Sequence, residues 1–269
     1  MKGDYRYMAD DYESFKKQIL TLTKIDLNAY KEGQMKRRID TLIGKQKCKS
    51  YNEYVNLIKT NHDRFEEFVN YLTINVSEFW RNPEQWKILE DKVIKDLVKK
   101  PSFKIWSAAC STGDEPYSLV MLLSKYVPMN RIKIIATDID KQVLEKAQAG
   151  LYIAKSLKGL PDDFKKKYFD QIGDNNFKIK DEVKRCVEFK IHNLLLDPYP
   201  SGCDLIVCRN VLIYFTEEAK DAIYVKFHDA LKTEGILFLG STEQIISPGK
   251  IGFSTISSFF YKKGEKPVK

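Results

Sequence analysis

The sequence predicts an α/β fold, in which a mostly parallel sheet with helices on both faces follows a small all-helical domain. From about residue 14 to residue 99, apolar residues repeat at helical spacing with few glycines, whereas after Pro101 short β-rich runs alternate with helical segments. The chain of 269 residues is 43% hydrophobic, which suffices for one large core or two smaller domains. We therefore expect a helical domain over residues 1–99 and an α/β domain over residues 100–269.

Helix-start signals divide the first of these regions. Ser50 followed by Glu53 forms a capping box, and Asn82-Pro83 places a cap and a first-turn proline before a further apolar helix. An apolar i, i+3, i+4, i+7 pattern between them indicates one more amphipathic helix. Several short helices of this kind make a small bundle.

The second region contains six segments with strand-like composition. Residues 155–184 are its least regular part and suggest a helix plus a small excursion from the sheet. The expected strands cover residues 103–109, 132–137, 187–192, 204–208, 236–239 and 259–262.

Composition limits the classes of partner and compartment. The chain carries 45 Lys+Arg against 37 Asp+Glu, a net charge of +8, which permits an acidic partner such as nucleic acid, an anionic membrane surface or a glutamate-rich protein. No apolar run approaches the ~18 residues of a membrane span, and charges run through the first twenty residues. Five cysteines lack a C-x-x-C pair and three histidines stand apart from them. We expect a soluble cytoplasmic protein with free thiols and no metal site.

The first strand-to-helix turn of the α/β region has the features of a nucleoside site. The strand ending at Ala109 leads into a loop that contains Gly113, and the next strand ends at Asp138, 25 residues later. An acidic residue at that strand tip commonly accepts hydrogen bonds from ribose hydroxyls. Because two of the three glycines of a dinucleotide loop are missing, a nucleoside without a pyrophosphate fits better than NAD. The alternative is that Gly113 is only a turn and Asp138 a helix cap.

Five segments then carry a resemblance to a known family. They are Asn-Val-Ser-Glu-Phe-Trp-Arg at 75–81, Trp-Ser-Ala-Ala-Cys-Ser-Thr-Gly-Asp-Glu-Pro-Tyr-Ser at 106–118, Ala-Thr-Asp-Ile-Asp at 136–140, Cys-Arg-Asn-Val-Leu-Ile-Tyr-Phe at 208–215, and Leu-Gly-Ser-Thr-Glu at 239–243. Together they resemble the CheR family of chemotaxis receptor methyltransferases, in the family's order and spacing, from about Tyr12 to Lys262.

This resemblance implies a Rossmann-like class I methyltransferase domain preceded by the helical domain. It also implies transfer of a methyl group from S-adenosylmethionine to glutamate side chains of bacterial chemoreceptors, leaving S-adenosylhomocysteine. Family members commonly have Thr at Ser77, Phe at Trp80 and Glu at Asp114, and each change keeps the chemical type. By motif match, the cofactor-binding residues are Asn75, Ser77, Arg81, Glu115, Asp138, Asn193, Leu194, Arg209 and Asn210.

Arg81 and Tyr214 are the candidate catalytic residues. A sulfonium methyl group is already electrophilic, and a glutamate with a pKa of about 4.3 is already ionised near neutral pH. The enzyme must therefore align the reacting atoms and exclude water, which requires neither a metal nor a strong base. Either side chain can donate to the incoming carboxylate. The alternatives are packing for Tyr214, a solvated charge for Arg81, and a helix cap with a core leucine for Asn193-Leu194.

A basic segment supplies a candidate docking surface. Residues 31–49 contain seven basic and two acidic side chains, and Arg37, Arg38 and Lys45 lie off the apolar arc of the helix predicted there. The resemblance implies that they face glutamate-bearing receptor helices; the alternative is a solvated lysine-rich face. Some family members bind a receptor tail through a small β excursion. Here residues 170–187 contain a single glycine, Gly173, and this scarcity of glycine argues against binding of a receptor tail.

Three other functions compete with this interpretation. A nucleic-acid methyltransferase would use the basic charge on phosphates, yet the Asn/Asp-Pro-Pro-Tyr/Phe loop of amino-methylating enzymes is replaced here by Cys-Arg-Asn-Val at 208–211. A non-catalytic S-adenosylmethionine-binding signalling module would be expected to lack Arg81 or Tyr214. An NAD oxidoreductase is weaker still, given the missing glycines.

Overall fold

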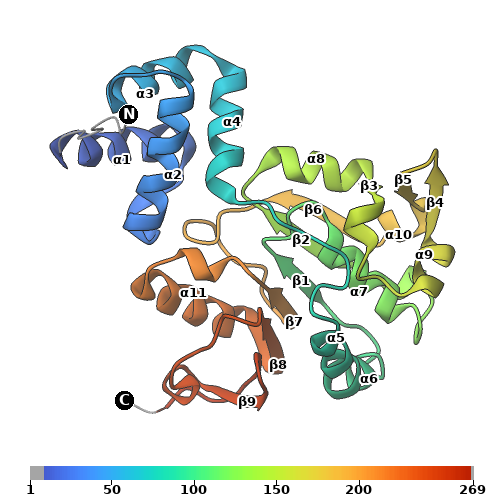
Figure 1. Cartoon of the computed structure of the whole chain (residues 1–269). Coiled ribbons are helices and arrows are strands. Elements are labelled where there is room, and N and C mark those ends of the chain that lie inside the picture. The colour runs from blue at the N-terminus through green and yellow to red at the C-terminus, as the bar shows by residue number, and fades with distance from the viewer. Residues whose placement is uncertain (1–8, 268–269) are drawn as a thin grey trace. The chain divides into compact units, whose positions relative to one another are not determined.

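The computed structural model describes residues 9–267 of the chain, and these form two compact units (Figure 1). The first unit comprises the described residues up to Ile74 together with Tyr214–Lys220; the second comprises Asn75–Ile213 and the described residues from Asp221 onwards. The helical segment between residues 83 and 97, which we expected in the helical domain, thus belongs to the second unit.

The first unit is a bundle of short helices around an aromatic core. Ser50 accepts a hydrogen bond from the Glu53 amide (3.1 Å), as expected for an N-cap, and Glu53 accepts from the amide of Lys49 (2.6 Å). Phe15 contacts both Tyr51 and Phe68 in the buried centre. The elements are α1 (Ala9–Thr23), η1 (Leu27–Ala29), α2 (Glu32–Lys45), α3 (Tyr51–Thr60) and α4 (His62–Thr73).

A seven-stranded sheet forms the centre of the second unit. Its order is β6-β2-β1-β7-β8-β10-β9; the first five strands run parallel, and β10 is antiparallel to both β8 and β9. Each of the six expected strands is present, and β9 is an additional one. Their bounds are β1 Ile105–Ala108, β2 Ile134–Asp138, β6 Val187–Ile191, β7 Cys203–Cys208, β8 Leu231–Leu239, β9 Phe253–Ser257 and β10 Phe260–Lys263.

The irregular stretch of the α/β region contains a second, small sheet. Strands β3 (Leu151–Ile153), β5 (Asn176–Ile179) and β4 (Phe169–Ile172) pair antiparallel, and α9 (Asp162–Tyr168) precedes β4. The excursion expected over residues 155–184 is therefore a three-stranded sheet that begins with β3 just before that stretch.

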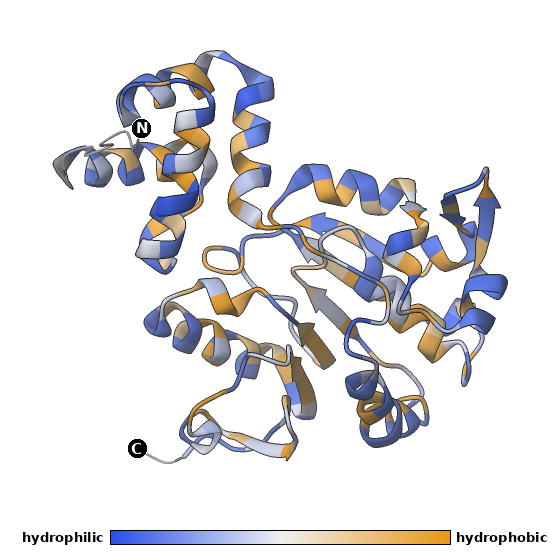
Figure 2. Cartoon of the chain, viewed as in Figure 1, coloured by the Kyte–Doolittle hydropathy of each residue, from blue (hydrophilic) through white to orange (hydrophobic). Residues whose placement is uncertain are grey.

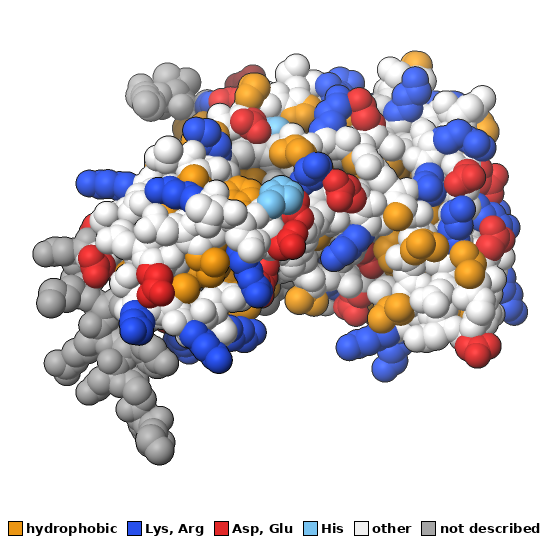
Figure 3. All heavy atoms as spheres, turned by 90° about the horizontal axis from the view of Figure 1, so that it is seen from above, with side chains coloured by type: hydrophobic (Ala, Val, Ile, Leu, Met, Phe, Trp, Pro, Cys, Tyr) orange, Lys and Arg blue, Asp and Glu red, His pale blue; other side chains and the backbone are white. Residues whose placement is uncertain are grey.

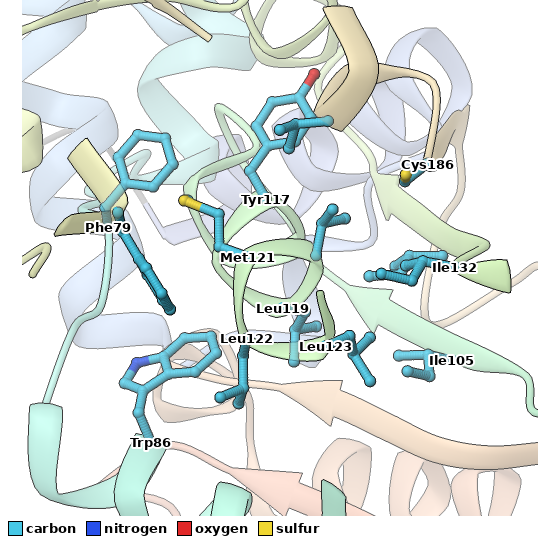
Figure 4. Close-up of a cluster of buried hydrophobic side chains, with 14 of the residues drawn as sticks. Phe79, Trp86, Ile105, Tyr117, Leu119, Met121, Leu122, Leu123, Ile132 and Cys186 are labelled. Carbon is cyan, nitrogen blue, oxygen red and sulfur yellow. The ribbon is translucent and has the colours of Figure 1, made fainter. Parts of the chain in front are cut away.

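The other helices of the second unit connect the strands. One contiguous core joins the helical segments 83–97 and 114–123 to the sheet, whereas Leu144 lies in a separate small cluster. Phe79 and Trp86, from the segment before β1, lie beside Met121 and Leu122 of α7 in this core (Figure 4). The elements are α5 (Pro83–Leu89), the π-helical turn η2 (Glu90–Ile94), α6 (Lys95–Leu97), α7 (Asp114–Leu123), η3 (Met129–Arg131), α8 (Lys141–Ala149), η4 (Ala154–Leu157), α10 (Asp181–Lys184), η5 (Leu212–Tyr214), α11 (Glu217–Ala230) and η6 (Pro248–Ile251). The last residue of η5 and the first four residues of α11 belong to the first unit.

Hydropathy follows burial. Strand β7 is mostly orange in Figure 2, and all six of its residues are buried, because a central parallel strand is covered on both faces. Over residues 9–267, no helix has the length and apolar character to cross a bilayer.

Candidate active site

The candidate site lies at the carboxyl ends of the parallel strands in the second unit. Strand β1 pairs with β2 on one side and with β7 on the other, so the strand order reverses direction at β1. In open α/β sheets, ligands bind at such a reversal, outside the carboxyl ends of the strands.

The backbone of the loop between β1 and α7 has a conformation that lets a ligand or a neighbouring helix come close to it. Ala109, Ser111 and Gly113 all have positive φ angles. A Cβ at Gly113 would stand 2.9 Å from the Cβ of Ala147, so a larger residue would push α7 and α8 apart. Gly113 is therefore more than a turn residue, since it also allows the two helices to pack closely.

Asp138, the last residue of β2, is a buried carboxylate. Its two oxygens accept hydrogen bonds from the backbone amides of Ser111 (2.8 Å) and Asp140 (3.1 Å), which join the first loop to the tip of the second strand. Burial raises the pKa of Asp138 to about 6. An ionised carboxylate there can also accept hydrogen bonds from a vicinal diol.

The helix cap that we considered for Asp138 is provided by Asp140. One oxygen of Asp140 accepts from the amide of Gln142 (2.9 Å), in the first turn of α8, and the other accepts from the side-chain amide of Asn75 (2.9 Å). Asn75 is thereby tied to the loop that follows Asp138. The structure thus brings two of the predicted cofactor residues to one corner of the sheet.

Glu115, in the first turn of α7, and Arg209, directly after β7, form a buried ion pair. A carboxylate oxygen of Glu115 lies 3.6 Å from the Arg209 guanidinium, and the other accepts from the hydroxyl of Ser107 (2.7 Å). Burial raises the pKa of Glu115, and the Arg209 charge opposes this shift. The Arg209 side chain is only 2% exposed, whereas that of Glu115 is 14% exposed. Of these two side chains, Glu115 is therefore the one whose exposed part could contact a ligand.

Arg209 also holds the backbone of the segment before α5. Its guanidinium donates to the carbonyl oxygen of Arg81 (2.7 Å) and to the side-chain oxygens of Asn82 (3.2 Å) and Gln85 (2.9 Å). Asn82 was predicted to cap α5, but its side chain makes no cap hydrogen bond. Asn82 does occupy the N-cap position, with Pro83 as the first helical residue, as predicted, and its side-chain oxygen accepts from an arginine 127 residues away.

Arg81 and Ser77 lie in this same segment. The Arg81 guanidinium donates to the carbonyl oxygen of Val76 (3.2 Å), which folds residues 76–81 back on themselves, and the side chain is partly exposed. Ser77 hydrogen-bonds the buried carboxylate of Asp114 in the first turn of α7. The segment is thus fixed at both ends, while the Arg81 head group remains accessible.

The loop after β6 carries Asn193 and Leu194. Asn193 uses its side-chain oxygen to accept from the amide of Leu195 (2.9 Å), which closes a local turn. Residues 194–196 form a turn and not a helix, so the helix cap that was the alternative for Asn193 is not what the structure has here. Sequence reasoning missed Lys226 of α11, whose ammonium donates to the carbonyl oxygens of Leu194 (3.0 Å), Leu195 (3.1 Å) and Asp197 (3.2 Å). Burial lowers the pKa of Lys226. No local pattern in the sequence marks this lysine.

Asn210 directly follows Arg209 at the end of β7, in a left-handed conformation with φ of 61°. Its amide donates to the carboxylate of Glu243 (2.7 Å), a residue quoted in the sequence motif but given no role. The feature of the sequence that could have pointed to Glu243 is its position: it is an acidic residue three positions after Gly240, and Gly240 directly follows a strand of apolar composition.

Cys110 and Cys208 lie buried near this edge. Burial raises the pKa of both thiols well above the ordinary value, so neither is activated as a thiolate nucleophile.

The remaining predicted residues belong to the first unit. The carbonyl oxygen of Tyr214 accepts from the amide of Lys31 (2.9 Å), and the ring of the next residue, Phe215, packs against the Tyr30 ring in a tilted arrangement with their centroids 4.7 Å apart. The Tyr214 side chain is partly exposed. Strand-like pairing of the 214–216 segment with this unit was not foreseen from the sequence.

Of the three basic residues predicted for docking, Arg37 and Lys45 are exposed on α2. Arg38 is turned toward α4, where it donates to the carbonyl oxygen of Tyr71 and covers the Tyr71 ring at 4.6 Å. Arg37 also borders an open groove of about 470 Å³ on α2. Arg38 therefore has a packing role that the helical periodicity did not reveal.

Comparison with known proteins identifies the family. The model described as "CheR methyltransferase, SAM binding domain" matches residues 75–259, and "CheR methyltransferase, all-alpha domain" matches residues 10–73. A chemotaxis protein methyltransferase of Listeria innocua is 40% identical over 255 residues, which covers 94% of this chain and 97% of that protein. Another, from Borreliella burgdorferi, is 33% identical over 253 residues, covering 89% of each chain.

A third relative, chemotaxis protein methyltransferase 1 of Pseudomonas aeruginosa, is 34% identical over 248 residues, covering 87% of this chain and 90% of its own length. These matches confirm the resemblance seen in the five sequence segments, and the strand order confirms the fold class. The chain belongs to the CheR family of S-adenosylmethionine-dependent chemotaxis protein methyltransferases.

Proposed function

We propose that this chain acts in the cytoplasm and esterifies glutamate side chains of bacterial chemoreceptors, using S-adenosylmethionine and releasing S-adenosylhomocysteine. The observation that carries the proposal is a pair of carboxylates at the carboxyl edge of the sheet, Asp138 at the end of β2 and Glu115 in the first turn of α7, with Arg81 on a segment anchored to the same edge. Family membership supplies the reaction class.

The side chains at this edge fit the proposed cofactor. Asp138 would accept hydrogen bonds from the ribose hydroxyls, and the Glu115 carboxylate would complement the amino group of the methionine portion. Leu194 would provide an apolar contact for adenine, with Asn193, Asn210, Asn75 and Ser77 as flanking polar contacts. Arg209 is assigned a different role from the one expected: it neutralises Glu115 and positions the Arg81 backbone.

The chemistry demands orientation more than activation. S-adenosylmethionine supplies an electrophilic methyl group when bound. Transfer of that methyl group to an ionised glutamate oxygen would leave S-adenosylhomocysteine and would require no proton transfer, so the residues of the site would have to hold and orient the two reactants. We assign to Arg81 the task of orienting the glutamate carboxylate by donating from its guanidinium. From the resemblance, we assign the Tyr214 hydroxyl as a second donor to that carboxylate.

Receptor docking is proposed for the first domain, through the exposed basic side chains of α2. Arg37 and Lys45 would face glutamate-bearing receptor helices. Arg38 would contribute by holding α2 against α4 through its hydrogen bond to the Tyr71 carbonyl group. On the face drawn in Figure 3, lysine and arginine side chains are interspersed with acidic ones. That pattern suits a mixed protein surface better than a continuous phosphate-binding track.

Removal of the Tyr214 hydroxyl tests the catalytic assignment. Tyr214→Phe should lower kcat for receptor methylation by about 10²-fold, the usual effect of losing one transition-state donor, while affinity for S-adenosylhomocysteine stays unchanged. Tyr126→Phe is a matched control, because the Tyr126 hydroxyl donates to Glu90 and Tyr126 follows the far end of α7. Equal kcat values for Tyr214→Phe and wild type would remove Tyr214 from the mechanism.

A further inference from the structure

The carboxylate of Glu243 is surrounded by backbone donors. One oxygen accepts from the amides of Asn210 (2.7 Å) and Gly240 (2.8 Å), and the other accepts from those of Val211 (2.9 Å) and Leu212 (2.6 Å). The residue is 3% exposed. Four N–H groups on two oxygens favour the ionised form, because the hydroxyl of a neutral acid would itself be a donor facing an N–H group. Burial acts in the opposite direction and raises the pKa of Glu243.

These donors come from two segments that the carboxylate joins. Three of them are consecutive residues that leave the carboxyl end of β7, and the fourth, Gly240, follows the end of β8. Consecutive amides that converge on one anion fix the backbone angles of their turn. Glu243 thus occupies a nest that the 210–212 turn forms around it.

The turn needs such support because its geometry is unfavourable alone. Asn210 has a φ of 61°, in the left-handed region, which asparagine adopts more readily than most residues but less readily than glycine. A Cβ at Gly240 would lie 2.5 Å from the Glu243 carboxylate and 2.8 Å from the Asn210 amide nitrogen. The absence of a side chain at Gly240 is therefore what allows the carboxylate to reach Asn210.

We propose that Glu243 is a positioning residue for methyl transfer. Its carboxylate fixes the backbone of the turn 210–212, which places Asn210 for contact with the cofactor and sets the direction in which the chain continues to Tyr214. The proposal rests on the proposed function, in which Asn210 contacts S-adenosylmethionine and Tyr214 contacts the substrate. Glu243 itself touches neither, since backbone amides occupy both of its oxygens.

The test is Glu243→Gln, which keeps size and shape but replaces one acceptor oxygen with an NH2 group that faces two N–H groups. We expect kcat for receptor methylation to fall between about 10-fold and 100-fold, as a misplaced group of this kind does, with weaker binding of S-adenosylhomocysteine. Glu243→Asp, which retains the charge on a shorter arm, should recover part of the lost kcat.

The matched control is Asp204→Asn. Asp204 is an equally buried carboxylate that also accepts from a backbone amide, that of Lys104 (2.9 Å), but it lies at the amino end of β7. This variant should lower the midpoint of thermal unfolding and leave kcat of the folded enzyme unchanged. If Glu243→Gln behaves like the control, with only its unfolding midpoint altered, Glu243 is structural and the proposal is wrong.

Amide hydrogen exchange provides a readout that needs no substrate. In Glu243→Gln, the amides of Asn210, Val211 and Leu212 should exchange at least about tenfold faster than in wild type, while in Asp204→Asn they keep their protection. If wild-type protein failed to methylate receptors, the proposed function would fall, but this exchange pattern would still report on the turn. Unchanged exchange at all three amides would overturn the positioning role by itself.

Discussion

Asp138 illustrates how a single residue links the fold to the proposed chemistry. Its position at a strand tip was readable from the sequence, because an acidic residue ending the second strand is a recurrent ribose ligand. Its two backbone partners were not readable, since the amides of Ser111 and Asp140 meet it only after the loop closes. The carboxylate therefore shapes the loop and remains the candidate ribose acceptor.

Loss of this carboxylate should weaken cofactor binding. Asp138→Ala removes a charged acceptor worth about 1.5–3 kcal/mol, which corresponds to roughly a 10- to 100-fold weaker affinity for S-adenosylhomocysteine by calorimetry. Asp204→Asn again serves as the control, because that carboxylate pairs with Lys100 and Lys232 at the opposite end of the sheet. Undiminished affinity in Asp138→Ala would count against the ribose role.

The raised pKa of Asp138 predicts a pH effect of definite sign. The ionised form accepts ribose hydroxyls, so affinity for S-adenosylhomocysteine should fall as the pH drops through about 6. Folding stability responds in the opposite direction: because the folded pKa lies above the unfolded value of 3.8, the contribution of this group is fully present below that value and is lost as the pH rises through about 6.

Binding titrations on both sides of pH 6 measure the first effect. The Asp138→Ala variant should show a flatter profile than wild type over that interval. Identical slopes for the two proteins would mean that another group is responsible for the pH dependence.

At the scale of elements, local sequence patterns predicted the features that depend on neighbouring residues, namely where strands and helices begin and end. The switch from helical periodicity to alternating strands located all six expected strands, and the capping box at Ser50 began α3 where expected. Contacts between distant segments were not predictable in this way. Asn82 remains the N-cap residue of α5, but its side-chain oxygen accepts from Arg209, and the Glu243 carboxylate accepts from a turn 31 to 33 residues earlier in the chain.

The loop after β6 shows the same limit. Its asparagine was expected at the cofactor site, and one turn is indeed organised around Asn193, but the lysine that holds this loop comes from α11. Residues that position a loop from a neighbouring helix leave no pattern in the loop's own sequence. Only packing of α11 against the loop shows the role of Lys226.

Substitution of Lys226 should therefore disturb the loop more than the fold. Lys226→Met keeps the length of the apolar stem but removes the donor from three carbonyl groups, so S-adenosylhomocysteine should bind about three- to tenfold more weakly. The control is Lys220→Met on the same helix, where the lysine pairs with Glu217 and not with the carbonyl groups of this loop. Equal affinities for these two variants would show that the loop does not depend on Lys226.

At the scale of the whole molecule, the predicted functional residues are distributed over two compact units. The second unit contains all of the predicted cofactor residues, whereas the first contains the basic helix α2 and, through a return of the chain at residues 214–220, the candidate catalytic Tyr214. The sequence predicted two domains but not this return, because a seven-residue segment gives no periodic signal of its own.

Receptor docking by α2 predicts a separation of the two activities. Arg37→Glu should slow methylation of intact receptors by about tenfold or more, with an effect that weakens at high salt, and leave S-adenosylhomocysteine affinity unchanged. Lys99→Glu makes the same charge change at an exposed site just after α6, in the second unit, and should leave the rate near that of wild type. Unaltered receptor kinetics in Arg37→Glu would exclude this docking surface.

The central claim is that the chain esterifies receptor glutamates, and transfer of radiolabelled methyl from S-adenosylmethionine to receptor-containing membranes tests it most directly. Carboxyl methyl esters hydrolyse in mild base, whereas N-methyl groups do not. The account predicts label on the receptor that is released by alkali. Label that resists alkali, label on nucleic acid, or cofactor binding without any transfer would contradict it.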